Sequence, residues 1–295
     1  MRRAYLPHAS HAVLNGVSQI FLQANPVCGA LILVTIALYA PSLLAGTLLG
    51  LLSGTLAAWC LGYARDDIEI GLYGYNPALL GLLITLVLGS SALALILVML
   101  AGALSSPLQR RLLRLMRERG GPAVLTLAFV LFGWLALALA GMLESVAEAR
   151  LVEFEVDGWG ALGAMASGVG QVIFLGEPAA GLCLLLALLV ADRRAALWAL
   201  CGSAVGVYSA LLAGATEQQA LAGLAGYNPA LAALALSQIH RSALIPTLGI
   251  ALAIGFKLAF DQLSLPPLTM PFILACWVVA LATQRDRRQP ETRLV

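Results

Sequence analysis

Ten apolar runs, separated by short polar connectors, constrain the fold of this chain more than any other feature. Only 11% of its 295 residues are charged, whereas a soluble protein has about 25%. Charged residues cannot therefore cover the surface of the chain, and the sequence predicts an all-α polytopic membrane protein with lipid around it. Several runs are shorter than the ~20 residues that cross a bilayer, so we expect them to pack against other helices. The runs occupy residues 26–40, 42–62, 76–89, 91–108, 121–142, 178–191, 195–213, 228–239, 242–260 and 264–283.

The basic residues predict how these runs are oriented. They gather at five places, all of which the positive-inside rule assigns to the cytoplasm. All five places can lie on the cytoplasmic side if two further runs, 9–24 and 159–176, which are more polar than the ten, enter the membrane without crossing it. Each half then has five spans and one half-spanning segment, and both termini are cytoplasmic. An odd number of spans in each half predicts two inverted repeats, residues 1–145 and 146–295, around a central pore. The basic places are Arg2–Arg3, Arg110–Arg119, Arg193–Arg194, Arg241 and Arg285–Arg288.

Three sequence blocks recur in the same order. GVSQIFLQANPVCG (16–29) matches GVGQVIFLGEPAAG (168–181), and GLYGYNPALLGLLI (71–84) matches GLAGYNPALAALAL (223–236). Both pairs are displaced by 152 residues, from 16 to 168 and from 71 to 223. A third pair, TLAFVLFGW and TMPFILACW, is displaced by 143, from 126 to 269. Transporters built from inverted repeats bind their substrates between the repeats, so duplicated polar residues are the leading candidates for the substrate path.

Three duplicated pairs could line such a path. Gln19 and Gln171 stand among glycine and aliphatic residues, and a buried amide there either joins two helices or faces the path; we expect it to face the path. Thr126 and Thr269 follow prolines that remove backbone donors, which predicts carbonyl oxygens free to face a solute. Tyr75 and Tyr227 are expected to be pore walls, with interfacial anchoring as the alternative.

Four polar residues each precede a proline. A polar N-cap followed by proline at the first helical position is a common helix start, so each is predicted to cap the helix that follows it. A helix that starts inside the membrane also directs free N–H groups toward a cavity, which makes these caps candidates for the pore mouth. The four residues are Asn25, Asn76, Glu177 and Asn228.

The sequence contains no catalytic or cofactor-binding constellation. It has no GxSxG, HExxH or Walker motif, and its five cysteines form no CxxC pair. A net charge of +2 without a basic patch argues against nucleic-acid binding. We therefore expect no enzyme, cofactor or metal site. Because no chain of ionisable residues crosses the membrane, ion coupling is poorly supported. A path without fixed charge suits a small, neutral solute rich in hydrogen-bond donors.

The repeated GLYGYNPAL and GLAGYNPAL blocks, the GVSQ and GVGQ blocks and LPPLTMPF (265–272) together resemble the urea transporter family over nearly the whole chain. The resemblance implies a homotrimer with one urea channel in each protomer. For a bacterial member it also implies a location in the inner membrane. It implies that oxygen atoms accept the N–H groups of urea along a slot whose walls are apolar. Two departures from the family pattern stand out: PAVLTLAF (122–129) lacks the second proline, and Leu22 replaces the aromatic residue three positions after Gln19. The positions that match the family's slot are Gln19, Gln171, Thr126, Thr269, Tyr75, Leu79, Tyr227, Leu231 and Phe174.

Three alternatives to a passive urea channel remain open from the sequence. The first is a channel for another small neutral solute, such as ammonia or a short amide. The second is an ion-coupled secondary transporter. The third, a membrane-embedded enzyme, has the least support because no nucleophile, base or metal-binding set converges in the sequence.

Overall fold

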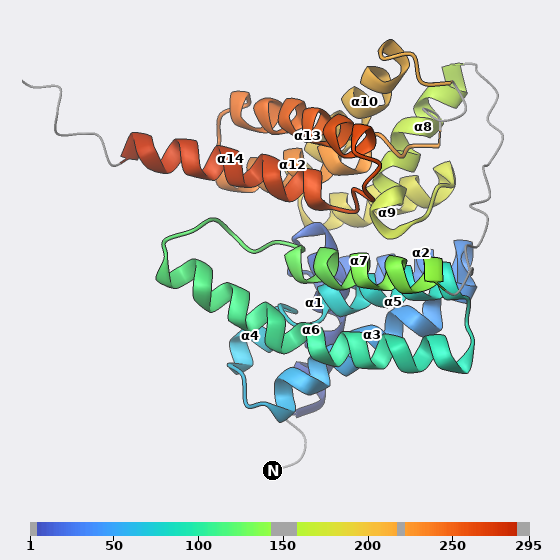
Figure 1. The fold of residues 1–295 in the computed structure, drawn as a ribbon, viewed down its shortest axis with the longest axis vertical. Coiled ribbons are helices and arrows are strands. Elements are labelled where there is room, and N and C mark those ends of the chain that lie inside the picture. Colours follow the sequence, from blue (N-terminus) through green and yellow to red (C-terminus); the bar gives the residue numbers. More distant parts are fainter. Residues whose placement is uncertain (1–4, 143–157, 217–221, 288–295) are drawn as a thin grey trace, which may run out of the picture.

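The computed structural model describes residues 5–142, 158–216 and 222–287, and all regular elements in these ranges are helices (Figure 1). We call residues 5–142 the first half and residues 158–287 the second half. The first half contains α1 (Tyr5–Ser18), η1 (Gln19–Phe21), α2 (Pro26–Tyr39), α3 (Pro41–Cys60), α4 (Arg65–Glu69), α5 (Tyr75–Leu88), α6 (Ala92–Glu118) and α7 (Leu127–Met142). The second half contains α8 (Gly158–Gly170), η2 (Gln171–Ile173), α9 (Pro178–Ala191), α10 (Arg193–Leu212), α12 (Tyr227–Ile239), α13 (Leu244–Gln262) and α14 (Met270–Arg287).

All ten apolar runs form helices, but the helices differ in length. Four of them, α3, α6, α10 and α13, are long and apolar enough to cross a membrane alone. Two more spans are possible if the bent pairs, α1 with α2 and α8 with α9, each count as one. The bends measure 76° and 74° and lie where the sequence predicts half-spanning segments. Helices α5 and α12, of 14 and 13 residues, are too short to cross alone and are buried along most of their length.

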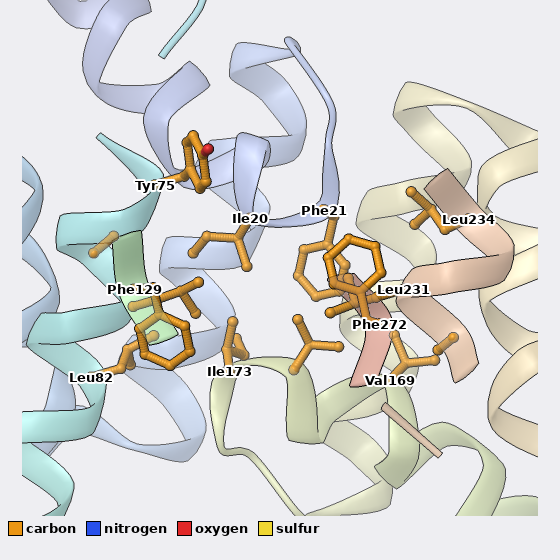
Figure 2. Packing of buried hydrophobic residues seen from close by; sticks show 14 of the residues in the cluster. Ile20, Phe21, Tyr75, Leu82, Phe129, Val169, Ile173, Leu231, Leu234 and Phe272 are labelled. Carbon is orange, nitrogen blue, oxygen red and sulfur yellow. The ribbon is translucent and has the colours of Figure 1, made fainter. Parts of the chain in front are cut away.

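The two halves lie side by side and share one core. In Figure 1 the first half, coloured blue to green, lies below the second half, coloured yellow to red. Helices α2 and α9 pack across the boundary, and α7 contacts α14. Figure 2 shows buried apolar side chains from both halves converging, among them Phe21 and Phe129 from the first half and Leu231 and Phe272 from the second. The boundary between the halves is therefore the apolar centre of the molecule.

Two helices begin later than the apolar pattern predicts. Helix α7 starts at Leu127 and α14 at Met270, each about six residues after the start of its apolar run. The preceding residues, 121–126 and 264–269, are not helical, and we call them the threonine segments. They contain prolines, which favour extended backbone in the residue before them. The backbone then turns through positive φ, 51° at Leu125 and 42° at Leu268, directly before the two threonines.

The basic part of α6 is also helical. The sequence predicts that the apolar run ends at residue 108, but α6 continues to Glu118 and carries four arginines beyond that point. The guanidinium of Arg110 lies 4.4 Å from the centre of the Tyr63 ring. The pKa of the neighbouring Tyr73 is raised, mainly because its hydroxyl is buried. In the second half, Arg194 donates hydrogen bonds to the carbonyls of His240 and Arg241, which brings two predicted cytoplasmic positions together.

Candidate functional site

A hydrogen bond between two threonines joins the halves at their centre. The Oγ1 atoms of Thr126 and Thr269 are 2.7 Å apart, and both residues are only 3% exposed. Neither hydroxyl bonds to its own helix, as threonines inside membrane helices commonly do. The mutual bond uses one hydrogen and one lone pair, so the pair retains one O–H donor and several lone pairs for a third molecule.

The two glutamines have matching surroundings in the two halves. Gln19 begins η1 and donates its Nε2–H to the Ile70 carbonyl at 3.0 Å. Gln171 begins η2 and donates to the Ala222 carbonyl at 2.8 Å. Both side chains are partly exposed. Because each amide nitrogen is held by the backbone, each side-chain oxygen is oriented and retains its lone pairs for a further donor.

Two glycines allow the chain that accepts the glutamine bonds to pack closely on the backbone three residues before each glutamine. Gly71 and Gly223 follow the two accepting carbonyls and have φ angles of 85° and 75°. A Cβ atom on Gly71 would lie 2.4 Å from the backbone nitrogen of Gly16, and one on Gly223 would lie 2.6 Å from that of Gly168. Any larger residue would therefore strain the backbone and collide with it at both places.

Only one of the four predicted side-chain caps is formed, and at two positions the polar residue is not the N-cap at all. Asn76 and Asn228 do not cap α5 and α12, because these helices already start one residue earlier, at Tyr75 and Tyr227. Instead, Asn76 Oδ1 accepts the Phe129 N–H and Asn228 Oδ1 accepts the Phe272 N–H, both at 3.1 Å. Each asparagine thus satisfies the first turn of the helix that follows a threonine segment. The prediction of a local cap was wrong here because the N–H groups that bond to these asparagines, those of Phe129 and Phe272, lie far from them in the sequence.

The two remaining caps occur where predicted, although only one uses its side chain. Asn25 Oδ1 accepts the N–H groups of Val27 and Cys28 at the start of α2. Glu177 occupies the equivalent position of α9, but its carboxylate makes no capping hydrogen bond. The predicted side-chain cap at Glu177 is therefore not formed, and this side chain is exposed.

A buried network in the first half ends next to Thr126. Tyr75 donates its hydroxyl to the Leu125 carbonyl at 2.6 Å and accepts a hydrogen bond from Gln109 Nε2 at 2.8 Å. Asn76 Nδ2 donates to Gln109 Oε1 at 3.2 Å, which closes the network. In the second half Asn228 Nδ2 donates directly to the Leu268 carbonyl at 3.0 Å. Tyr75 is thus buried and hydrogen-bonded, whereas Tyr227 is partly exposed.

The predicted apolar walls also differ between the halves. Leu79 and Leu231 are each 1% exposed and belong to the shared core. Leu22 and Phe174 follow η1 and η2 in left-handed conformation, with φ angles of 57° and 62°. The ring of Phe174 lies 6.5 Å from that of Phe129, across the boundary between the halves. Residues far apart in sequence are thus brought together at the centre.

Four carbonyls of the threonine segments, which the sequence predicts to be free to face a solute, each accept one side-chain hydrogen bond and retain a second lone pair. Side chains donate to the carbonyls of Ala123, Leu125, Pro266 and Leu268. Two of these donors are Trp134 and Trp277, whose repetition is visible in the sequence although their role is not. Gln109 had no such signal, because it lies between an apolar run and a group of arginines and matches no residue of the other half.

The site combines oriented oxygen atoms with apolar surroundings. The described residues include no group of three or more histidine, cysteine or acidic side chains that could hold a metal ion. The side chains at the centre are amides, hydroxyls and hydrocarbons, so the site can exchange hydrogen bonds but carries no fixed charge. Such a site suits a neutral solute with several N–H donors.

Comparison with known proteins agrees with this chemistry. The sequence model of the urea transporter family matches residues 10–284. Urea transporter 1 of Ovis aries is 28% identical over 295 residues, an alignment that covers 93% of this chain and 77% of the relative. Urea transporter 1 of Rattus norvegicus is 27% identical over 295 residues, with the same coverage. The chain therefore belongs to the urea transporter family.

Proposed function

We propose that this protein conducts urea passively across a membrane, through a slot between its two halves. The observation that carries the proposal is the Thr126–Thr269 hydrogen bond, which places two hydroxyls from opposite halves at a buried, uncharged centre. In this proposal Gln19 and Gln171 provide oriented oxygen atoms on either side of the threonines. Tyr75, Leu79, Tyr227 and Leu231 form the walls.

The hydrogen-bonding capacity of the site matches that of urea. Urea is planar and has four N–H donors and one oxygen acceptor. The threonine pair retains lone pairs to accept N–H groups and one O–H to donate, and each glutamine offers a free oxygen. Each hydrogen bond that a solute loses to water and does not regain in an apolar passage costs roughly 2–7 kcal/mol. A row of acceptors at the edge of a flat slot lowers this cost.

The absence of charge among the proposed slot residues favours passive conduction over ion coupling. Coupled transporters commonly bind their ions with carboxylates or with unwound backbone carbonyls. In this chain the proposed slot residues have no carboxylate.

The two ends of the proposed slot differ in shape. At the second-half end Phe174 packs near Phe129, whereas Leu22 occupies the equivalent place in the first half. A leucine cannot provide the flat ring face that Phe174 provides. We therefore place the stricter selection for planar solutes at the Phe174 end.

Several features support inverted repeats of residues 1–145 and 146–295. The bends, the glutamine bonds, the asparagine bonds and the positive φ angles all recur in both halves. In Figure 1, α7 runs away from the side on which α6 ends, whereas α14 runs toward that side. We further propose a homotrimer with one pore per protomer and, in a bacterium, an inner-membrane location with cytoplasmic termini.

The proposal is tested by the swelling of protein-loaded liposomes in urea, acetamide and methylamine. We expect swelling in urea to be faster than in protein-free liposomes, and faster than swelling in the other two solutes. Urea permeation equal to that of protein-free liposomes would refute the proposal. Faster permeation of acetamide or methylamine alone would favour a channel for a different neutral solute.

A further inference from the structure

Two tryptophans connect each half of the molecule to the threonine segment of the other half. Trp134 on α7 donates its indole N–H to the carbonyl of Pro266 at 2.8 Å. Trp277 on α14 donates its indole N–H to the carbonyl of Ala123, also at 2.8 Å. Each accepting carbonyl lies three residues before the threonine of its segment. The contact is therefore reciprocal, with each half supplying one donor and one acceptor.

The two indole bonds lie nearer the surface than the buried threonine pair, since Ala123 and Pro266 are exposed, but they hold the same two segments. The threonine segments have left the helical hydrogen-bonding pattern, so their carbonyls need partners from elsewhere. The two indoles supply such partners without bringing charge to the centre. Together with the Thr126–Thr269 bond, they make three hydrogen bonds between the halves around the same two segments.

We propose that Trp134 and Trp277 are positioning residues that fix the spacing of the two threonine segments and thereby the width of the urea slot. This inference rests on the proposed function, because it assigns the tryptophans a role in the same pathway. Neither indole needs to touch urea. Each acts through the backbone that carries Thr126 or Thr269.

The surroundings of the two tryptophans are unequal, and this inequality makes the proposal specific. The Trp134 ring stacks with Phe260 of α13, with ring centres 6.5 Å apart and planes at 22°. Near Trp277 there is a cavity of about 200 Å³, which is also lined by Ala123 and Leu125. The first-half threonine segment therefore borders an open pocket rather than packed side chains, and it can move toward this pocket when the Trp277 bond is lost.

The slot should consequently loosen more when Trp277 loses its N–H than when Trp134 does. Without that bond, the 121–126 segment can shift toward the cavity and draw Thr126 away from Thr269. A wider gap between Thr126 and Thr269 weakens their hydrogen bonds to urea and excludes bulkier solutes less strictly. The expected signature is a change in selectivity, which a purely structural role would not produce.

The experiment measures urea and methylurea permeability in proteoliposomes containing wild-type protein, Trp134→Phe, Trp277→Phe or the double variant. Phenylalanine keeps an aromatic ring and removes the N–H donor. Trp59→Phe is the matched control, since Trp59 on α3 is 52% exposed and lies outside the site. We expect the double variant to raise the methylurea-to-urea ratio about threefold or more, with most of the change produced by Trp277→Phe alone. Trp59→Phe should match wild type.

A double variant that conducts urea with the wild-type ratio would overturn the role of the tryptophans while leaving the proposed function intact. A parallel loss of both permeabilities at constant ratio would also overturn it. If wild-type protein itself fails to conduct urea, the proposed function fails instead. Should the variants not fold, ultraviolet resonance Raman spectra of protein that retains only Trp134 and Trp277 report the hydrogen bonding of their indole N–H groups. Bonded N–H groups support the proposal, and free ones contradict it.

Discussion

Replacement of Thr269 by valine tests the centre of the proposed slot with almost no change in side-chain volume. The substitution removes the Oγ1 atom that lies 2.7 Å from Thr126 Oγ1, at a position only 3% exposed. A urea molecule then meets one hydroxyl instead of two. A hydrogen bond left unmade in a buried place costs about 1–3 kcal/mol, which corresponds to roughly a 5- to 150-fold change in rate. Because Thr126 loses its partner and becomes available to urea, we expect a decrease near the lower end, about tenfold.

Stopped-flow light scattering of proteoliposomes in a urea gradient measures this decrease, normalised to the amount of inserted protein. Thr47→Val is the matched control. Thr47 is fully buried on α3, and its hydroxyl bonds to the Leu43 carbonyl of its own helix. The control should conduct urea as wild type does. Wild-type urea flux through Thr269→Val would refute the argument that the threonine pair supports urea on its path.

Three further outcomes follow from the same geometry. Gln171→Leu removes an oriented acceptor and leaves the Ala222 carbonyl without its donor, so proteoliposome urea flux should fall about tenfold; an unchanged flux would exclude Gln171 from the path. Asn228→Ala removes the cap on the Phe272 N–H and should lower the free energy of unfolding by about 1–2 kcal/mol, measured by thermal or denaturant unfolding in detergent. Urea flux should change less than about twofold between roughly pH 6 and pH 8, because amides and aliphatic hydroxyls do not titrate there; a steep pH dependence would implicate a titratable group.

The apolar runs and the repeated blocks predicted much of this structure. The boundaries of α2 and α3 agree with the runs to within about two residues, because a proline begins each helix and apolar residues continue it. The helix predictions succeeded because local patterns of apolar residues and prolines determine helices. The repetition also singled out the glutamine and threonine pairs, whose role on a urea path stays a prediction.

Long-range partners were not predictable in the same way. Asn76 looks like a local cap, yet it satisfies Phe129, which lies 53 residues away. Leu125 and Leu268 adopt positive φ, although leucine has no preference for that conformation. Neither displacement pairs Gln109 with another glutamine, since residue 252, displaced by 143, is leucine and residue 261, displaced by 152, is aspartate. In each case the conformation depends on tertiary contacts that a single sequence does not reveal.

The most direct test of the central claim is stopped-flow urea uptake into proteoliposomes without any ion gradient, with and without an ionophore. The account predicts uptake faster than in protein-free liposomes, driven by the urea gradient alone and unaffected by the ionophore. Uptake that requires a proton or sodium gradient, or that equals the rate of protein-free liposomes, would contradict it.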